Sequence, residues 1–243
     1  MALTVSCIIP AFNEGPRIAA VLSVASAHPL VDEVIVVDDA SSDDTAAQVA
    51  HFDRVHLIRQ PQNRGKSAAI AAGLRAARGD VILFLDSDLL GLDATALQAL
   101  LLPVIHDRAD ATISLRGNAP APWHWLGLDY LSGERAMRRA LAPAPEVLEQ
   151  LPRFGMEVCM NTLWLNHGAR LQVIAWPKVA SPYKSTKRGF LRGLVADLAM
   201  TRDILSTVGA ATLLRQIRAL RVSRVAMPNR RRKGPTISTG AGR

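Results

Sequence analysis

Two carboxylates separated by one residue, Asp86 and Asp88, directly follow a short apolar run at residues 81–85. In an extended chain, residues two apart point to the same side, so both carboxylates can face one ligand. Carboxylate oxygens are hard ligands of the kind that Mg²⁺ and Mn²⁺ prefer. We therefore predict a divalent-cation site that could also hold a diphosphate. The alternative is that these residues form a turn or cap the helix that follows.

More acids end a second apolar run, where Asp38 and Asp39 follow residues 33–37. A carboxylate at this point can accept hydrogen bonds from a ribose hydroxyl or from a base N–H. The alternative is that Asp39 caps a helix beginning near Asp43 while Asp38 is solvated. Farther along, residues 63–66 (Asn-Arg-Gly-Lys) precede an alanine-rich stretch. A lysine at a helix start attracts phosphate, although an ordinary turn would use the same residue types.

The elements that must position these side chains alternate between apolar runs and helical patterns. Such alternation predicts an α/β fold, with a mostly parallel sheet covered by helices on both faces. In these folds ligands bind at the carboxyl ends of the strands, where the acids lie. The expected strands are 4–10, 33–37, 55–59, 81–85 and 111–115, and the expected helices are 17–27, 43–51 (capped by Ser41 or Ser42), 66–78 and 94–106.

The pattern changes after Arg116. A loop rich in proline and tryptophan is expected at 118–125. We also expect helices at 132–141 and 157–167, a strand at 171–176, a long helical stretch at 189–225, and an unstructured basic tail at 229–243.

Four segments of the first half resemble motifs of glycosyltransferase family 2, in the family's order. Residues 7–14 (CIIPAFNE) resemble its opening IPAYNE, and residues 36–45 (VVDDASSDDT) resemble its VVDDGSTDGT. Residues 63–69 (NRGKSAA) are similar to its NxGKGxA, and residues 79–88 (GDVILFLDSD) to its GDxIxFLDAD. The resemblance covers about residues 4–116. Within it, Ala40 replaces the usual glycine.

The resemblance implies a GT-A fold, a UDP-, GDP- or dTDP-sugar donor, and Mg²⁺ or Mn²⁺ at Asp86 and Asp88. It implies a catalytic domain at 1–188, with a nucleotide-sugar half at 1–116 and an acceptor half at 117–188. A helical segment at 189–228 and the tail would follow. The implied nucleotide-sugar-binding residues are Pro10, Ala11, Asn13, Glu14, Asp38, Asp39, Lys66, Asp86 and Ser87.

Two further segments, 131–136 (LSGERA) and 154–157 (FGME), resemble acceptor-side motifs of two subgroups. One subgroup makes polyprenyl-phosphate sugars and the other makes glucosyl-3-phosphoglycerate. The resemblance makes Glu134 and Glu157 catalytic candidates beside Asp88. Glu157 could take a proton from an acceptor hydroxyl, whereas an ionised phosphate acceptor needs no base. The alternative is that each glutamate is an acid in the first turn of a helix.

Basic residues concentrate at the end of the chain. Residues 178–243 hold fifteen Lys/Arg and two Asp, whereas residues 1–177 hold fourteen Lys/Arg and nineteen Asp/Glu. Lys184, Lys187 and Arg188 are candidates for binding a diphosphate or an acceptor phosphate. Some family members place a metal-ligating histidine in this region, but residues 179–187 contain none. A helix with basic and apolar faces, followed by a basic tail, can also bind an anionic membrane surface.

The amino-acid composition narrows the classes of protein to which this chain could belong. Two cysteines are too few for a disulfide framework, and no apolar run reaches the ~18–20 residues that span a bilayer. We therefore expect a cytoplasmic protein, peripheral on the membrane's cytoplasmic face, that does not bind nucleic acid. A nucleotidyltransferase is the alternative enzyme class, but it would show a glycine-rich basic loop after the first strand, where this chain has Ala11-Phe12-Asn13-Glu14. A nucleic-acid-binding protein ranks last, because the first 177 residues are net acidic.

Overall fold

A seven-stranded sheet forms the centre of the molecule in the computed structural model, which describes residues 2–151, 155–182 and 210–224. The strand order is β3-β2-β1-β4-β6-β5-β7, and β6 alone runs antiparallel to its neighbours. The predicted mostly parallel α/β fold is confirmed. The strands are β1 (Val5–Ala11), β2 (Glu33–Asp38), β3 (Val55–Arg59), β4 (Val81–Phe84), β5 (Ala111–Arg116), β6 (Arg135–Arg138) and β7 (Leu171–Trp176).

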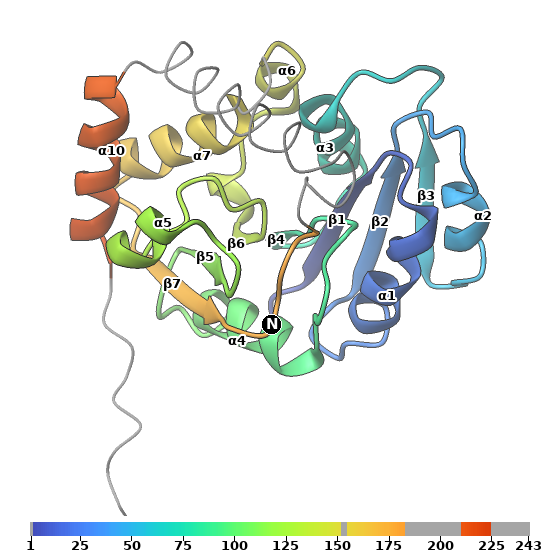
Figure 1. The fold of residues 1–243 in the computed structure, drawn as a ribbon, viewed down its shortest axis with the longest axis horizontal. Coiled ribbons are helices and arrows are strands. Elements are labelled where there is room, and N and C mark those ends of the chain that lie inside the picture. Colours follow the sequence, from blue (N-terminus) through green and yellow to red (C-terminus); the bar gives the residue numbers. More distant parts are fainter. Residues whose placement is uncertain (1, 152–154, 183–209, 225–243) are drawn as a thin grey trace, which may run out of the picture.

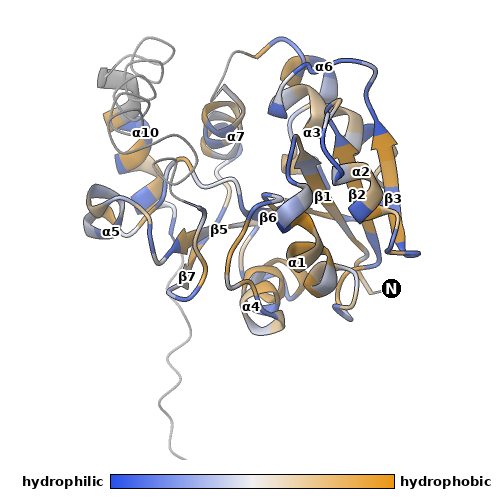
Figure 2. Cartoon of the chain, turned by 45° about the vertical axis from the view of Figure 1, so that its right-hand side comes forward, coloured by the Kyte–Doolittle hydropathy of each residue, from blue (hydrophilic) through white to orange (hydrophobic). Residues whose placement is uncertain are grey.

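Helices cover both faces of the sheet, as Figure 1 shows. One apolar layer joins the sheet to α1 (Gly15–Ala25), α2 (Thr45–Val49) and α4 (Ala94–Ile105). The opposite layer joins it to α3 (Lys66–Ala76), α6 (Pro145–Leu148), α7 (Gly155–Asn166) and α10 (Ala210–Val222). The central strands β1 and β4 are buried along their whole length, which explains their continuous apolar sequences. Figure 2 shows this hydrophobic character in the neighbouring strands β1, β2 and β3.

The register of the sheet brings the acidic segments to one edge. Strands β2 and β4 both run parallel to β1, with Ala11 opposite Asp38 and Ile8 opposite Phe84. Strands β2 and β3 lie on one side of β1, whereas β4 lies on the other. The direction in which successive strands are added to the sheet therefore reverses at β1. In α/β folds such a reversal leaves a crevice at the carboxyl ends of the two strands, here β1 and β4.

The structure corrects the sequence prediction in the acceptor half. Residues 132–141, expected to be helical, contain strand β6 and a short 3₁₀ helix at Arg139–Leu141. Strand β6 forms because β4 and β5 pair with it from both sides, and such long-range pairing overrides local helix preference. Most of the expected loop at 118–125 forms a short helix, α5 (Ala121–Leu126), which has a proline in its first turn and is followed by Gly127 at its C-cap.

The loop after β2 departs from the predicted capping. Helix α2 begins at Thr45, and neither Ser41 nor Ser42 caps it. The Ser41 hydroxyl instead accepts a hydrogen bond from the backbone N–H of Asn13 at 2.9 Å. Ala40 has a φ of +60°, a conformation that costs an L-residue roughly 1–2 kcal/mol and that glycine adopts freely. This explains why glycine is usual at the position.

Candidate active site

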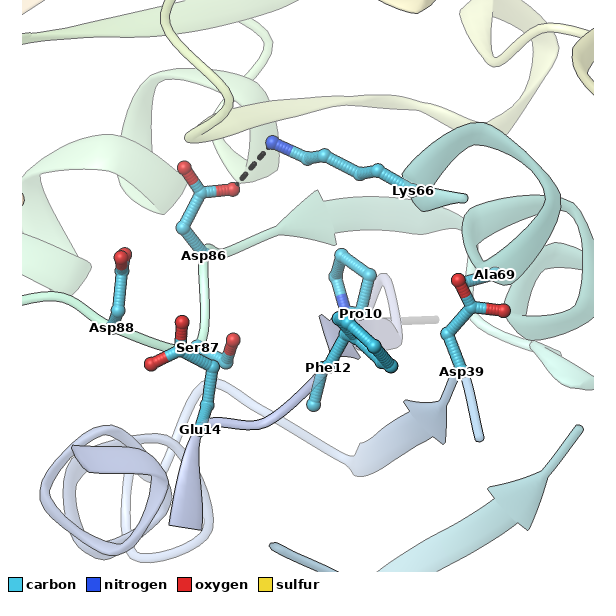
Figure 3. Close-up of a pocket in the computed structure, with 10 residues that line it drawn as sticks. Pro10, Phe12, Glu14, Asp39, Lys66, Ala69, Asp86, Ser87 and Asp88 are labelled. Atoms are coloured by element: carbon cyan, nitrogen blue, oxygen red, sulfur yellow. Dashed lines mark hydrogen bonds and ion pairs between the residues drawn. The ribbon is translucent and has the colours of Figure 1, made fainter. Parts of the chain in front are cut away.

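A pocket of about 240 Å³ opens at the carboxyl edge of the sheet. Figure 3 shows Asp86, Ser87, Asp88 and Glu14 along one side and Asp39 on the other, with Pro10 and Phe12 between them. Its walls come from the loops after β1, β2 and β4 and from the start of α3. Segments far apart in sequence therefore converge on one hollow. The residues that line it are Pro10, Ala11, Phe12, Glu14, Asp39, Lys66, Ala69, Asp86, Ser87 and Asp88.

Asp86 forms an ion pair with Lys66 across the pocket. The Lys66 Nζ lies 2.6 Å from Asp86 Oδ1, a contact drawn as the dashed line in Figure 3. Burial alone would raise the pKa of Asp86, but the charge and hydrogen bond of Lys66 outweigh it and lower this pKa. A Cβ atom on Gly133 would lie only 2.7 Å from both Asp86 Oδ1 and Lys66 Nζ. Glycine at this position therefore lets the acceptor-half loop pass directly against the ion pair.

Asp88 lies two residues farther along, on the same side of the pocket as Asp86 (Figure 3). Neither residue caps α4, because Asp93 does so by accepting a hydrogen bond from Ala96 N at 2.7 Å. This excludes the capping alternative. Among the residues that the structure describes, no group of three or more His, Cys, Asp or Glu side chains is arranged to hold a metal ion. Two hard carboxylates beside an open pocket fit a cation whose other ligands are diphosphate and water.

Asp39 forms the opposite wall and is only 3% exposed. Its two carboxylate oxygens accept hydrogen bonds from the backbone N–H groups of Arg64, at 2.8 Å, and Gly65, at 2.7 Å. Gly65 caps the N-terminus of α3, whose first residue is Lys66. Asp39 thus fixes the loop that places the pocket lysine, and the alternative that it caps α2 is wrong.

Two of the predicted nucleotide-sugar-binding residues lie outside the pocket lining. The side-chain oxygen of Asn13 accepts a hydrogen bond from Ser42 N at 2.8 Å, which ties the β1 loop to the β2 loop. Asp38 is fully buried rather than solvated; it accepts a hydrogen bond from Ser41 N at 2.9 Å and lies 3.4 Å from Arg59 Nε. In this structure both residues brace the loops that carry the pocket, and their contact with a nucleotide stays a prediction.

Glu134 is fully buried and does not line the pocket, but it interacts with Asp86. Its carboxylate accepts hydrogen bonds from Ser114 Oγ at 2.8 Å and Ser132 Oγ at 2.9 Å. Burial raises the pKa of Glu134; Arg116, 3.5 Å away, opposes this, and the negative charge of Asp86 raises it further. Glu134 precedes a strand, so the alternative of a helix-start acid is wrong for it. The predicted catalytic role of Glu134 stays a prediction.

Arg116 was missed by sequence reasoning. It ends β5 and joins Glu134 to Asp129, whose Oδ2 lies 3.2 Å from the guanidinium. The charges of Glu134, Asp129 and Asp86 outweigh the effect of burial and raise the pKa of Arg116. An arginine following an apolar run is too common a pattern to have signalled this role.

Glu157 approaches the pocket from the acceptor half. It lies in the first turn of α7, is 6% exposed, and its Oε1 is 3.9 Å from Lys66 Nζ. The buried Arg135 donates a hydrogen bond to Asn161 Oδ1 at 2.7 Å, and its Cζ lies over the Trp164 ring, 5.1 Å from the ring centroid. Arg135 was not predicted either. It fixes α7 against the loop before β6, and thereby the place of Glu157.

Comparison with known proteins agrees with this architecture. A family model described as "Glycosyl transferase family 2" matches residues 6–153, more than half of the chain. The chain belongs to glycosyl transferase family 2. The family expected from the four motifs is thereby confirmed.

Curated relatives match a limited part of the chain. A dolichyl-phosphate beta-glucosyltransferase, ALG5C, of Trichomonas vaginalis is 38% identical over 94 residues, which cover 33% of this chain and 28% of the relative. A glucosyl-3-phosphoglycerate synthase of Mycolicibacterium paratuberculosis is 40% identical over 95 residues, covering 36% and 29%. The chain thus matches less than a third of the length of these relatives.

Solved structures match more of the fold. The glucosyl-3-phosphoglycerate synthase of Mycobacterium tuberculosis, in complex with Mn²⁺ and UDP-glucose, superposes with a TM-score of 0.64 at 25% identity. The match covers 88% of this chain and 79% of that one. The same enzyme with Mn²⁺, UDP and glucosyl-3-phosphoglycerate gives a TM-score of 0.62 at 25% identity, covering 88% and 80%. The predicted GT-A fold is confirmed.

Several expectations for this family 2 chain lie outside the described residues. They concern Lys184, Lys187 and Arg188, predicted to bind phosphate, the long helical stretch before residue 210, and the basic tail at 229–243. The domain boundaries at 188 and 228 also fall there. The described part of the helical stretch, α10, packs Ile217 and Leu220 into the core and leaves Arg215, Arg218 and Arg221 exposed.

Proposed function

We propose that this chain transfers a sugar from a nucleotide-diphospho-sugar to a phosphorylated acceptor, with Mg²⁺ or Mn²⁺ at Asp86 and Asp88. One observation carries the proposal: carboxylates from three different loops and a lysine from a helix start line the same pocket. The pocket lies at the strand edge where α/β folds bind their ligands. Family membership supplies the reaction type.

The two sides of the pocket suggest how a donor lies in it. The Asp86 and Asp88 side offers ligands for a metal-bound diphosphate, and Lys66 offers a positive charge for its oxygens. The Asp39 side, near Pro10 and Ala11, would receive the nucleoside. When bound, the metal neutralises charge that develops on the departing diphosphate. The buried Glu134 and the partly buried Arg116 both interact with Asp86 and would help to hold it in place.

The acceptor is proposed from the relatives. The curated relatives are named for dolichyl phosphate and for phosphoglycerate as acceptors, both of which carry a phosphate. Lys184, Lys187 and Arg188 would bind that phosphate, and Glu157 faces the pocket from the acceptor side. A polyprenyl phosphate is our preferred acceptor, because the segment that binds it would adjoin the basic end of the chain.

Other classes fit less well. A nucleotidyltransferase would place a glycine-rich basic loop after β1, but residues 11–14 place an acid and an aromatic ring at the pocket instead. A nucleic-acid-binding protein would line its recognition surface with basic groups, whereas this pocket is lined mainly by carboxylates and apolar residues.

A donor panel tests the proposal. We expect Mn²⁺- or Mg²⁺-dependent release of nucleoside diphosphate from one of UDP-glucose, GDP-mannose or dTDP-glucose, with turnover rising when polyprenyl phosphate or phosphoglycerate is added. Mass spectrometry of the glycosylated acceptor identifies the product. Absence of turnover with every donor and acceptor pair, from folded protein with metal present, would contradict the assignment.

We further propose that the enzyme works as a peripheral protein on the cytoplasmic face of a membrane. Within the described residues, no helix is long and apolar enough to cross a bilayer. The outer side of α10 carries three exposed arginines together with Leu214, 63% exposed, and Val222, 85% exposed. Basic residues near an anionic leaflet contribute about 1 kcal/mol each.

Liposome co-sedimentation tests this membrane contact. We expect deletion of residues 229–243, or replacement of Arg215, Arg218 and Arg221 by alanine, to weaken binding to anionic vesicles at least about tenfold. The matched control replaces three exposed arginines elsewhere and should bind as wild type does. Equal loss in the control would show that net charge alone, and not this face, drives binding. The control arginines are Arg54, Arg78 and Arg108.

A further inference from the structure

A lysine ammonium lies where a metal ion would approach the first carboxylate of the site. Lys66 Nζ is 2.6 Å from Asp86 Oδ1 and 3.9 Å from Glu157 Oε1. A lysine side chain is protonated at neutral pH, so its ammonium brings a full positive charge to Asp86.

The position of this ammonium is constrained from several directions. Lys66 is the first residue of α3, and Asp39 fixes the preceding turn through Arg64 and Gly65. From the acceptor half, the backbone of Gly133 leaves so little room that a Cβ atom would lie 2.7 Å from Nζ. Figure 3 shows the lysine side chain extending across the pocket to Asp86.

We propose that Lys66 takes the place of the metal until the donor binds, and that the donor diphosphate then draws its ammonium away from Asp86. This inference rests on the proposed metal site at Asp86 and Asp88. A divalent cation and an ammonium repel each other strongly at such short range in a partly desolvated pocket. In the absence of the donor, the metal must therefore displace Lys66 from Asp86. Its binding is weak for that reason.

The donor diphosphate removes the competition between Lys66 and the metal for Asp86. Its oxygens give the ammonium a new anionic partner and also complete the shell of the metal. Metal and donor then each strengthen the binding of the other, and by linkage the enhancement is the same in both directions. The free enzyme keeps Asp86 neutralised, and the metal site is completed when a nucleotide diphosphate arrives.

Calorimetric titration of the full chain with Mn²⁺, with and without saturating UDP, tests the inference without any measurement of activity. We expect UDP to raise the Mn²⁺ affinity of the wild type on the order of 5- to 150-fold. In Lys66→Met, Mn²⁺ alone should bind about tenfold tighter, so the enhancement by UDP should shrink by a similar factor. Lys66→Arg keeps the charge and should behave like the wild type.

Two controls separate the outcomes. Lys178→Met makes the same change at an exposed lysine after β7 and should leave Mn²⁺ binding unaltered. One outcome is that Lys66→Met binds Mn²⁺ no tighter than wild type while Asp88→Asn loses Mn²⁺ binding. In that case the role of Lys66 in taking the place of the metal, its placeholder role, is wrong and the metal site stands. If Asp88→Asn binds Mn²⁺ as wild type does, the metal site and the placeholder role are rejected together. Should Lys66→Met not fold, Lys66→Gln replaces it.

Discussion

Asp88→Asn is expected to lower kcat/KM at least about 10³-fold, equivalent to about 4 kcal/mol of transition-state stabilisation. The amide keeps the shape of the side chain but removes a charged oxygen from the proposed metal site. With that ligand lost, the diphosphate leaves without the neutralising charge that a bound cation supplies. Nucleoside-diphosphate release, measured across a Mn²⁺ titration, reports the effect.

The fold should survive this change. Asp88 is partly exposed at the pocket and lies in the loop after β4, outside the two apolar layers. We expect a thermal unfolding midpoint within a few degrees of wild type. Asp53→Asn is the matched control, because Asp53 is exposed and precedes β3, at the edge of the sheet opposite the pocket. Full activity of Asp88→Asn, or of wild type in excess chelator, would contradict the metal assignment.

The first half of the fold was predictable because its signals are local. Strands buried on both faces appear as continuous apolar runs, and each ends at the polar residue where the carboxyl edge begins. The start of α3 at Lys66 followed from the alanine-rich stretch that begins there. The alternation of strands and helices predicts a parallel sheet, and a parallel sheet brings Asp39, Asp86 and Asp88 to one edge. This inference needs no knowledge of side-chain contacts.

The acceptor half was less predictable because long-range contacts decide its structure. Strand β6 contains Arg135 and Met137, which favour helices in isolation, but it fills the gap between β4 and β5. The ion-pair network of Arg116, Glu134 and Asp129 joins the end of β5 to the loop before β6. The Lys66–Asp86 pair joins residues twenty positions apart. No spacing rule reveals such pairs before the sheet is assembled.

Glu157→Gln should separate the two kinds of acceptor. On a hydroxyl acceptor such as phosphoglycerate, we expect kcat to fall about 10²- to 10⁴-fold, the usual loss when a general base is removed. On a polyprenyl phosphate, whose attacking oxygen is already ionised, the fall should stay below about tenfold. Steady-state kinetics with each acceptor at saturating donor measures both values, and KM should change less than kcat in the first case.

The position of Glu157 makes the comparison sensitive to chemistry. Its side chain is held in the first turn of α7 and faces the Lys66 ammonium, so the isosteric amide preserves packing while it removes a proton acceptor. Glu146→Gln makes the same change at an exposed side chain on α6 that pairs with Arg75, and should leave kcat unaltered. If Glu157→Gln keeps full kcat on a hydroxyl acceptor, Glu157 is not the base. An equal large loss on both acceptors would instead indicate that Glu157 acts by positioning Lys66.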